Sequence, residues 1–217
     1  YLVREMRAFA RLAELSGREG LAAEYREKAA ALAERMRALM WAEADGWFYD
    51  RNARAGEALM SRHAGWASSF NNSPDGLIRV KSAASFAALW AGVATPEQAR
   101  RMIFEHLFNP REFWTPAPVA ALAKSERWYS RDWLPGDLGC NWRAHAWVPT
   151  NYMAYRGLRS YGYDQLAALV AHATHRLVKT AGNREYYDSE TGEGNGLDPF
   201  WGWSLLGHFL PYEEQAG

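Results

Sequence analysis

Two acidic residues in the C-terminal part of the chain lie among aromatic side chains, in the stretch from Asn183 to Phe200. Glu185 is followed directly by two tyrosines, and Glu193 stands between two glycines. Aromatic rings stack on the apolar C–H face of a sugar ring, and a carboxylate among them can move the protons of glycosidic bond cleavage. These residue types in this order therefore indicate a carbohydrate site.

A second set of candidate residues lies about forty positions upstream, at Asn141, Trp142, Arg143 and Trp147, just before a predicted helix. The two tryptophans can form a platform for a sugar ring, and Arg143 can donate to hydroxyl groups or to a carboxylate. The alternative is a helix-capping loop that packs on the core. His145, in the same stretch, is equally compatible with a structural histidine.

Glu185 is the strongest candidate for catalysis. An inverting glycosidase needs a carboxylate base that activates water and an acid on the opposite face of the sugar, about 6.5–9.5 Å away. The alternative is a structural salt bridge to Arg184, Arg143 or Arg156. Glu193 is either a ligand contact or part of a surface turn, because its flanking glycines suit both.

The composition excludes several classes of protein. The 217 residues contain 25 Lys plus Arg and 25 Asp plus Glu, so no excess of positive charge favours nucleic acid or an acidic membrane as a partner. No run of eighteen apolar residues predicts a membrane-spanning helix. The single cysteine, Cys140, cannot form an internal disulfide and implies nothing about secretion, and a reducing cytoplasm is the default expectation. The 11 Trp and 11 Tyr suit either a lined cavity or an aromatic core.

Metal and cofactor chemistry have no sequence support. The six histidines show no HExxH or related ligand spacing, so we expect no metal site. The chain also has no GxGxxG after a strand, no P-loop and no GxSxG elbow, so we expect no cofactor.

Hydrophobic periodicity predicts a mostly helical fold. Long loops that hold the aromatic and acidic residues separate the helices, and strand signals are few, at 47–49 and 185–187. Thr95 followed by Pro96 and Glu97 is a good helix start, and Asp164 is expected to cap another helix. The predicted helices are 2–16, 20–40, 82–92, 95–108, 149–161, 164–179 and 203–212. This alternation predicts a helical toroid or bundle with the site in loops at one end.

Three motifs of the chain resemble signatures of glycoside hydrolase family 63 and its relatives. WRAHAWVPTNYMAYRGLRSYGY resembles the WRGPVW…NY…Y.GL..YGY signature of that family. REYYDSETGEGNG…FWGWS is similar to EYYNP.TGEG.G…FSWSA, and LMWAEADGWFYDRN is similar to LW.E.DGFFYD. The resemblance extends from about Met36 to Leu206 and is most specific in the two C-terminal motifs.

The resemblance implies an all-α fold that is part of an (α/α)6 toroid, and inverting hydrolysis of an α-glycosidic bond. The general base of the family falls on Glu185, and Trp142 and Trp147 line the sugar site. With the candidates found above, the expected substrate contacts are Asn141, Trp142, Arg143, Trp147, Tyr187, Glu193 and Trp201. Bacterial members act on small solutes such as mannosylglycerate and glucosylglycerate, and a glycerate carboxylate would suit Arg143 or His145.

The chain departs from the family pattern in two ways. Ala144, His145 and Ala146 replace the usual Gly-Pro-Val, and Asn141 replaces a common aromatic residue, which leaves the usual substrate in doubt. The general acid of the family is an Asp far upstream of the base, before Tyr1, and neither Asp132 nor Asp137 has the expected context.

The position of the missing acid predicts that residues 1–217 form one domain, the C-terminal half of a catalytic barrel whose N-terminal half is absent. Because the acid is missing, we expect residues 1–217 to be inactive on their own. A half barrel exposes apolar flanks, so we also expect the chain to self-associate or to pair with the missing half.

Two other classes of protein remain open at this point. One is a catalytically incomplete carbohydrate-binding or scaffold domain, which the missing acid favours. The other is a toroid enzyme such as a sugar epimerase, which would rely on histidine rather than on paired acids. An Asp in an aromatic context just upstream of Tyr1 in the parent gene would favour the glycosidase.

Overall fold

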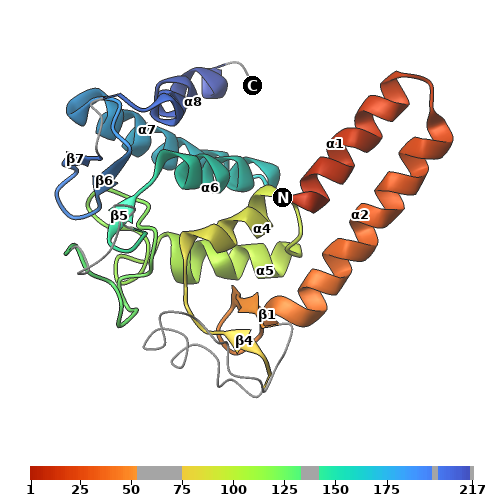
Figure 1. Ribbon diagram of the computed structural model, residues 1–217, viewed down its shortest axis with the longest axis horizontal. Helices are drawn as coiled ribbons and strands as arrows, with labels where there is room; N and C mark the ends of the chain where they lie inside the picture. Colours follow the sequence, from red (N-terminus) through yellow and green to blue (C-terminus); the bar gives the residue numbers. More distant parts are fainter. Residues whose placement is uncertain (53–74, 133–141, 197–199, 216–217) are drawn as a thin grey trace. The chain divides into compact units, whose positions relative to one another are not determined.

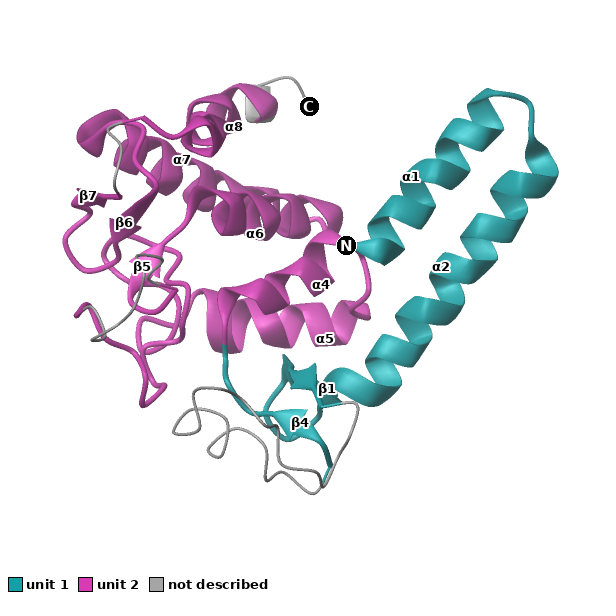
Figure 2. Ribbon diagram, in the orientation of Figure 1, with its two compact units in different colours: residues 1–81 teal, residues 82–217 magenta. Residues whose placement is uncertain are grey.

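A computed structural model describes residues 1–52, 75–132, 142–196 and 200–215 of the chain (Figure 1). The chain divides into two compact units, residues 1–81 and residues 82–217 (Figure 2). Each unit is described separately below.

The first unit begins with a helical hairpin. Helix α1 (Leu2–Leu15) turns at Gly17, whose φ is +70°, and helix α2 (Glu19–Met40) follows. A positive φ is accessible to glycine without steric cost, so Gly17 suits the sharp turn. Alanines are the main buried residues of both helices, and small side chains let two helix backbones approach closely.

Two pairs of short antiparallel strands complete the first unit. Strand β1 (Trp41–Ala42) pairs with β2 (Trp47–Phe48), and β3 (Asp50–Arg51) pairs with β4 (Leu77–Ile78). The predicted strand at 47–49 is therefore confirmed in its first two residues, where the aromatic side chains of Trp47 and Phe48 are buried.

The second unit holds the remaining helices of the described chain. The 3₁₀ turn η1 leads into α4, α5 continues as the π-helix η2, and the 3₁₀ turn η3 leads into α8. The bounds are η1 (Ala83–Phe86), α4 (Ala87–Trp90), α5 (Pro96–Arg101), η2 (Met102–Leu107), α6 (Val148–Ser160), α7 (Asp164–Ala181), η3 (Gly202–Leu205) and α8 (Leu206–Gln215).

Two glycines allow close helix packing in this unit. A methyl group at Gly157 of α6 would lie 2.7 Å from Cβ of Leu89 in α4, and one at Gly207 of α8 would lie 2.6 Å from Val178 Cγ2 in α7. Both distances are shorter than carbon atoms tolerate, so only glycine fits at these crossings. The helices that carry the site are therefore held in close contact.

A three-stranded antiparallel sheet lies at one end of these helices and positions the candidate site. Its strands are β5 (His145–Ala146), β6 (Tyr186–Asp188) and β7 (Gly194–Asn195), in the order β5-β6-β7. His145 pairs with Asp188, and Tyr186 pairs with Asn195. The sheet thus joins the two sequence stretches that carry the candidate residues.

The predicted helices are confirmed, with local differences. The helix predicted at 95–108 changes to a π-helix at Met102, and its start is a capping box between Thr95 and Gln98. The prediction that Asp164 caps α7 is wrong, because Tyr163 occupies the N-cap and Asp164 is already helical. Over the described ranges the fold is mostly helical, with three small sheets, rather than helical throughout. The half-toroid and one-domain predictions stay predictions.

Within the parts of the chain that the structure describes, no helix is long and apolar enough to cross a membrane.

Candidate active site

Glu185 is the residue directly before strand β6, and both its backbone N–H and its backbone carbonyl are hydrogen-bonded. Its backbone N–H donates to the carbonyl of Asn195 at 3.1 Å. Its own carbonyl accepts from the indole Nε1 of Trp203 at 2.9 Å. The residue as a whole is 5% exposed. The acid expected to be the base is therefore buried on a fixed stretch of backbone.

The side chain of Glu185 lies against the backbone of Gly196. Gly196 has a φ of +123°, and a methyl group there would lie 2.5 Å from Cβ and 3.0 Å from Oε2 of Glu185. Only glycine combines this backbone conformation with this lack of bulk. Gly196 thus makes room for the Glu185 side chain.

Aromatic rings form a stack next to β6. Trp142 stacks on Trp147 with ring centroids 3.9 Å apart and planes 4° apart, and Trp147 stacks in turn on Tyr186 at 5.0 Å. Trp203 lies 6.0 Å from Trp147 and 4.8 Å from Trp201. Trp147 is 1% exposed whereas Trp142 is 50% exposed, so Trp142 presents the accessible ring of the stack.

The two neighbouring tyrosines of β6 pack in different clusters, because successive side chains point to opposite faces of a strand. Tyr186 joins the aromatic stack, whereas Tyr187 packs in the hydrophobic core with Val148 of α6 and Val178 of α7. The Tyr187 hydroxyl donates to the carbonyl of Gly182 at 2.7 Å. Tyr187 therefore packs in the core, and its expected contact with a sugar stays a prediction.

The remaining predicted contacts differ in how the structure places them. Glu193 is exposed in the turn between β6 and β7, and its carbonyl accepts from the Asp188 backbone at 2.8 Å. Trp201 is partly buried, and its Nε1 has no hydrogen-bond partner in the described structure. Asn141 lies outside the described residues, as do Asp137 and Cys140.

Arg143 and His145 are buried beside the stack. Arg143 donates from Nη2 to the carbonyl of Asp132, and its Nε has no partner among the described residues. His145 meets the Tyr186 ring edge-on at 4.9 Å. Burial lowers the pKa of His145 to about 4, despite the opposing attraction of Asp188, so the ring is neutral at physiological pH.

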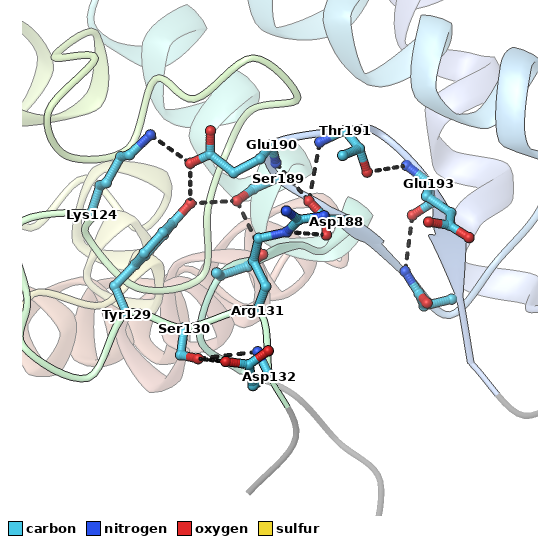
Figure 3. A network of polar contacts seen from close by, with 12 residues as sticks. Lys124, Tyr129, Ser130, Arg131, Asp132, Asp188, Ser189, Glu190, Thr191 and Glu193 are labelled. Atoms are coloured by element: carbon cyan, nitrogen blue, oxygen red, sulfur yellow. Dashed lines mark hydrogen bonds and ion pairs between the residues drawn. The ribbon is translucent and has the colours of Figure 1, made fainter.

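Asp188, at the end of β6, has a fully bonded carboxylate (Figure 3). Its Oδ2 accepts from Arg131 Nε at 2.6 Å, and its Oδ1 accepts from the backbone N–H groups of Glu190 at 2.8 Å and Thr191 at 3.1 Å. Burial would raise the pKa of Asp188, but these hydrogen bonds outweigh it, so the pKa lies below its usual value.

A second set of polar contacts ties the same hairpin to the loop that precedes Arg131. Tyr129 donates from its hydroxyl to Glu190 at 2.7 Å, and Lys124 pairs with Glu190 at 2.6 Å. The Lys124 bond holds the pKa of Glu190 below its usual value, and burial raises the pKa of Tyr129. With Asp188, these residues fix the hairpin rather than offer free groups for chemistry.

Two of the arginines considered as salt-bridge partners for Glu185 interact with other groups. Arg156 pairs with Glu213 at 2.9 Å, and Arg143 donates to the Asp132 carbonyl. Among the described residues, no group of three or more His, Cys, Asp or Glu side chains could hold a metal ion.

Sequence reasoning missed the role of three residues. Trp203, Gly196 and Asp188 were not among the candidate site residues. The Asp-x-x-Thr spacing after β6 is typical of a side chain that bonds the backbone two or three residues on, and it was the available signal for Asp188.

Comparison with known proteins gives the class of protein, the glycoside hydrolases, and the family within it. Residues 1–204 match the model of the mannosylglycerate hydrolase MGH1-like glycoside hydrolase domain. The chain belongs to this family.

Characterised relatives agree with this assignment. The chain is 33% identical over 158 residues to the mannosylglycerate hydrolase of Thermus thermophilus. The aligned region covers 68% of this chain and 33% of that protein. It is 32% identical over 130 residues to the mannosylglycerate hydrolase of Rubrobacter radiotolerans, 59% of this chain and 28% of that protein. The chain thus spans about a third of the length of these relatives.

A solved structure shares the fold. The crystal structure of a family 63 mannosylglycerate hydrolase from Thermus thermophilus, in complex with glucose, matches with a TM-score of 0.73 and 23% identity. The match covers 97% of this chain and 45% of that one.

Proposed function

We propose that this chain carries the general base and part of the sugar-binding surface of an inverting α-glycosidase. The observation that carries the proposal is Glu185, a buried acid whose backbone is held by Asn195 and by Trp203, a ring that contacts Trp147 of the aromatic stack. Family membership supports the reaction class, and the resemblance of the REYY motif to the family signature supports Glu185 as the base.

In the proposed reaction Glu185 takes a proton from a water molecule, and the water oxygen attacks the anomeric carbon. The bond from that carbon to the leaving oxygen breaks as a general acid protonates this oxygen, so the sugar is released with inverted configuration. We propose that the acid is an Asp from the part of the family fold that this chain does not span. The chain would then form the C-terminal portion of the barrel and depend on the rest for activity.

The proposed sugar contacts are Trp142, Arg143 and Trp201, with Glu193 and Asn141 at the edge of the site. Trp142 offers an accessible ring on which a sugar can stack, because Trp147 and Tyr186 support it from below. Trp147 acts through this support, because its own ring is buried. Tyr187 is left out because it packs in the core.

The proposed substrate is a small sugar or a sugar joined to glycerate, as in the names of the relatives. Arg143 supplies a buried guanidinium with an unpartnered Nε among the described residues, and a guanidinium recognises a carboxylate well. The replacement of Arg143 by alanine would then reduce turnover of anionic substrates more than that of neutral ones. An equal loss on neutral sugars would contradict this role for Arg143.

The test of the proposed function uses the complete gene product and a panel of mannosylglycerate, glucosylglycerate, trehalose and short α-glucosides. We expect one substrate to be hydrolysed, proton NMR to detect the inverted anomer first, and Glu185→Gln to abolish turnover. Retention of configuration would exclude the inverting mechanism. Binding of a sugar without hydrolysis by a folded protein would favour the alternative, a carbohydrate-binding or scaffold domain. The predicted cytoplasmic location stays a prediction.

A further inference from the structure

We propose that the 3₁₀ turn η3 (Gly202–Leu205) is a positioning element for Glu185, acting through the side chains of Trp203 and Ser204. The proposal rests on the proposed function, because it explains how the base is held. Neither residue was among the site residues expected from the sequence.

Three successive carbonyls just before β6 accept hydrogen bonds from the segment around η3. The carbonyl of Asn183 accepts from the backbone N–H of Trp201 at 2.8 Å. The carbonyl of Arg184 accepts from the hydroxyl of Ser204, and that of Glu185 accepts from Trp203 Nε1 at 2.9 Å. Each residue of the stretch 183–185 is therefore held by a donor that lies well downstream in the chain.

The opposite side of this stretch is held by the sheet. The N–H of Glu185 donates to the carbonyl of Asn195, and the following residue, Tyr186, pairs with Asn195 in the β6–β7 ladder. Glu185 therefore has its N–H bonded to a strand and its carbonyl bonded to η3. Such two-sided bonding restricts the φ and ψ angles that aim its side chain.

Precise aim matters for a general base. The carboxylate must lie within hydrogen-bond reach of the attacking water, and a displacement of about 1 Å can reduce the rate about a hundredfold. The rings add rigidity, because Trp203 contacts both Trp201 and Trp147. We therefore assign to η3 the task of linking the base to the aromatic stack.

Ser204 separates positioning from sugar contact. Trp203 is 36% exposed, so its replacement could change substrate stacking as well as the bond to Glu185. Ser204 is completely buried and cannot reach a sugar in the described structure. An effect of Ser204→Ala on catalysis would therefore act through the backbone of Arg184 and Glu185.

The first part of the test measures the clamp, meaning the hydrogen bonds from the segment around η3 to the carbonyls of residues 183–185. The measurement is hydrogen–deuterium exchange of peptides that cover residues 183–188. We expect Ser204→Ala and Trp203→Phe each to speed exchange of these amides about fivefold, the range that loss of one hydrogen bond implies. The matched control is Tyr161→Phe, which removes a tyrosine hydroxyl bonded to the carbonyl of Ala94 at 2.6 Å at the far end of α6. The control should leave exchange at 183–188 unchanged.

The second part measures kcat and KM of the same variants in the complete gene product. We expect Ser204→Ala to lower kcat about fivefold with KM unchanged, and Tyr161→Phe to change neither. Faster exchange with an unchanged kcat would overturn the positioning role, and unchanged exchange would overturn the clamp itself. If the wild type hydrolyses no sugar, the proposed function fails, and exchange still decides whether η3 holds the stretch 183–188.

Discussion

Two buried acids, Glu185 and Asp188, lie three residues apart at the two ends of the same short strand, and the protein holds them in different ways. The carboxylate of Asp188 accepts three hydrogen bonds, from Arg131 and from two backbone N–H groups. At Glu185 the main chain is held, by Asn195 on one side and Trp203 on the other. The side chain of Glu185 lies against Gly196.

The comparison shows how similar burial can serve different purposes. The two residues are 5% and 6% exposed, so exposure does not distinguish them. A carboxylate that is saturated by donors stabilises the fold and has little capacity left to accept a proton from water. A residue whose backbone is fixed from two sides, with its side chain against a glycine, suits a base. The four changes below test this contrast, from the largest expected effect to the smallest.

Glu185→Gln should have the largest effect, on the rate. Glutamine has nearly the same shape but cannot act as a base, so we expect kcat to fall about a thousandfold while the melting temperature stays unchanged. Steady-state kinetics and calorimetry of the complete gene product would measure both. A variant that retains full activity would remove the distinction between the two acids.

Gly196→Ala should damage both stability and rate. The added methyl group would lie 2.5 Å from Cβ of Glu185 on a residue with φ of +123°. We expect a loss of about 3 kcal/mol in the free energy of unfolding, because the strain of the backbone and the clash both act.

The control for Gly196 is Gly20→Ala in α2, where no atom lies within 4 Å of the new methyl group. Alanine has a higher helix propensity than glycine, so this control should gain up to about 1 kcal/mol. Urea denaturation would measure both variants. Equal stability of the two would show that Gly196 is not needed for the placement of Glu185.

Asp188→Asn should reduce stability without loss of kcat. Loss of charge-assisted hydrogen bonds from Arg131 and the backbone should cost about 2 kcal/mol at neutral pH. Because the pKa of Asp188 is lowered in the folded state, its contribution is present above the unfolded pKa of about 3.9 and is lost as the pH falls through the folded value. Unfolding curves of wild type and variant should therefore converge in acid. A constant difference at all pH values would contradict the role of the charge.

His145→Gln should have the smallest effect, a change in the pH dependence of stability. The pKa of His145 is lowered by burial to about 4, so the unfolded chain binds a proton more readily than the folded chain between pH 4 and the ordinary value of 6.5. The charged groups that act on it are Asp188, Arg143 and Arg131. Wild-type stability should fall as the pH drops through this range, and between pH 6.5 and about 5.5 the variant should lack about 1 kcal/mol of that fall. Equal slopes would show that His145 is not buried as a neutral ring.

The helices were predictable because their signals are local. Apolar spacing gave α1, α2 and α7 nearly residue by residue, and Thr95 with Pro96 marked the start of α5. The change to a π-helix at Met102 was not predictable, because a single short π-turn is too brief to alter the apolar spacing of the segment. Asp164 was misjudged as a cap because the first turn of a helix and its cap favour the same acidic residues.

The candidate site was only partly predictable. Glu185, Trp142 and Trp147 could be named because acids and aromatic residues carry recognisable chemistry. Tyr187 could not be separated from Tyr186, because the direction of a side chain depends on the pairing of β6 with its neighbours. Nothing in the sequence pairs Arg131 with Asp188, since the two are 57 residues apart.

The sequence by itself determined the helical rhythm, the family and the identity of the acid proposed as the base, because each depends on residue types and on spacings within one element or motif. Only the tertiary structure decided which donors hold the Asp188 carboxylate, which tyrosine packs in the core and which tryptophan holds the carbonyl of Glu185. Those outcomes depend on hydrogen bonds and packing between segments far apart in the chain. Many of the acceptors are backbone carbonyls, which every residue has. No residue type therefore indicates in the sequence where these hydrogen bonds form.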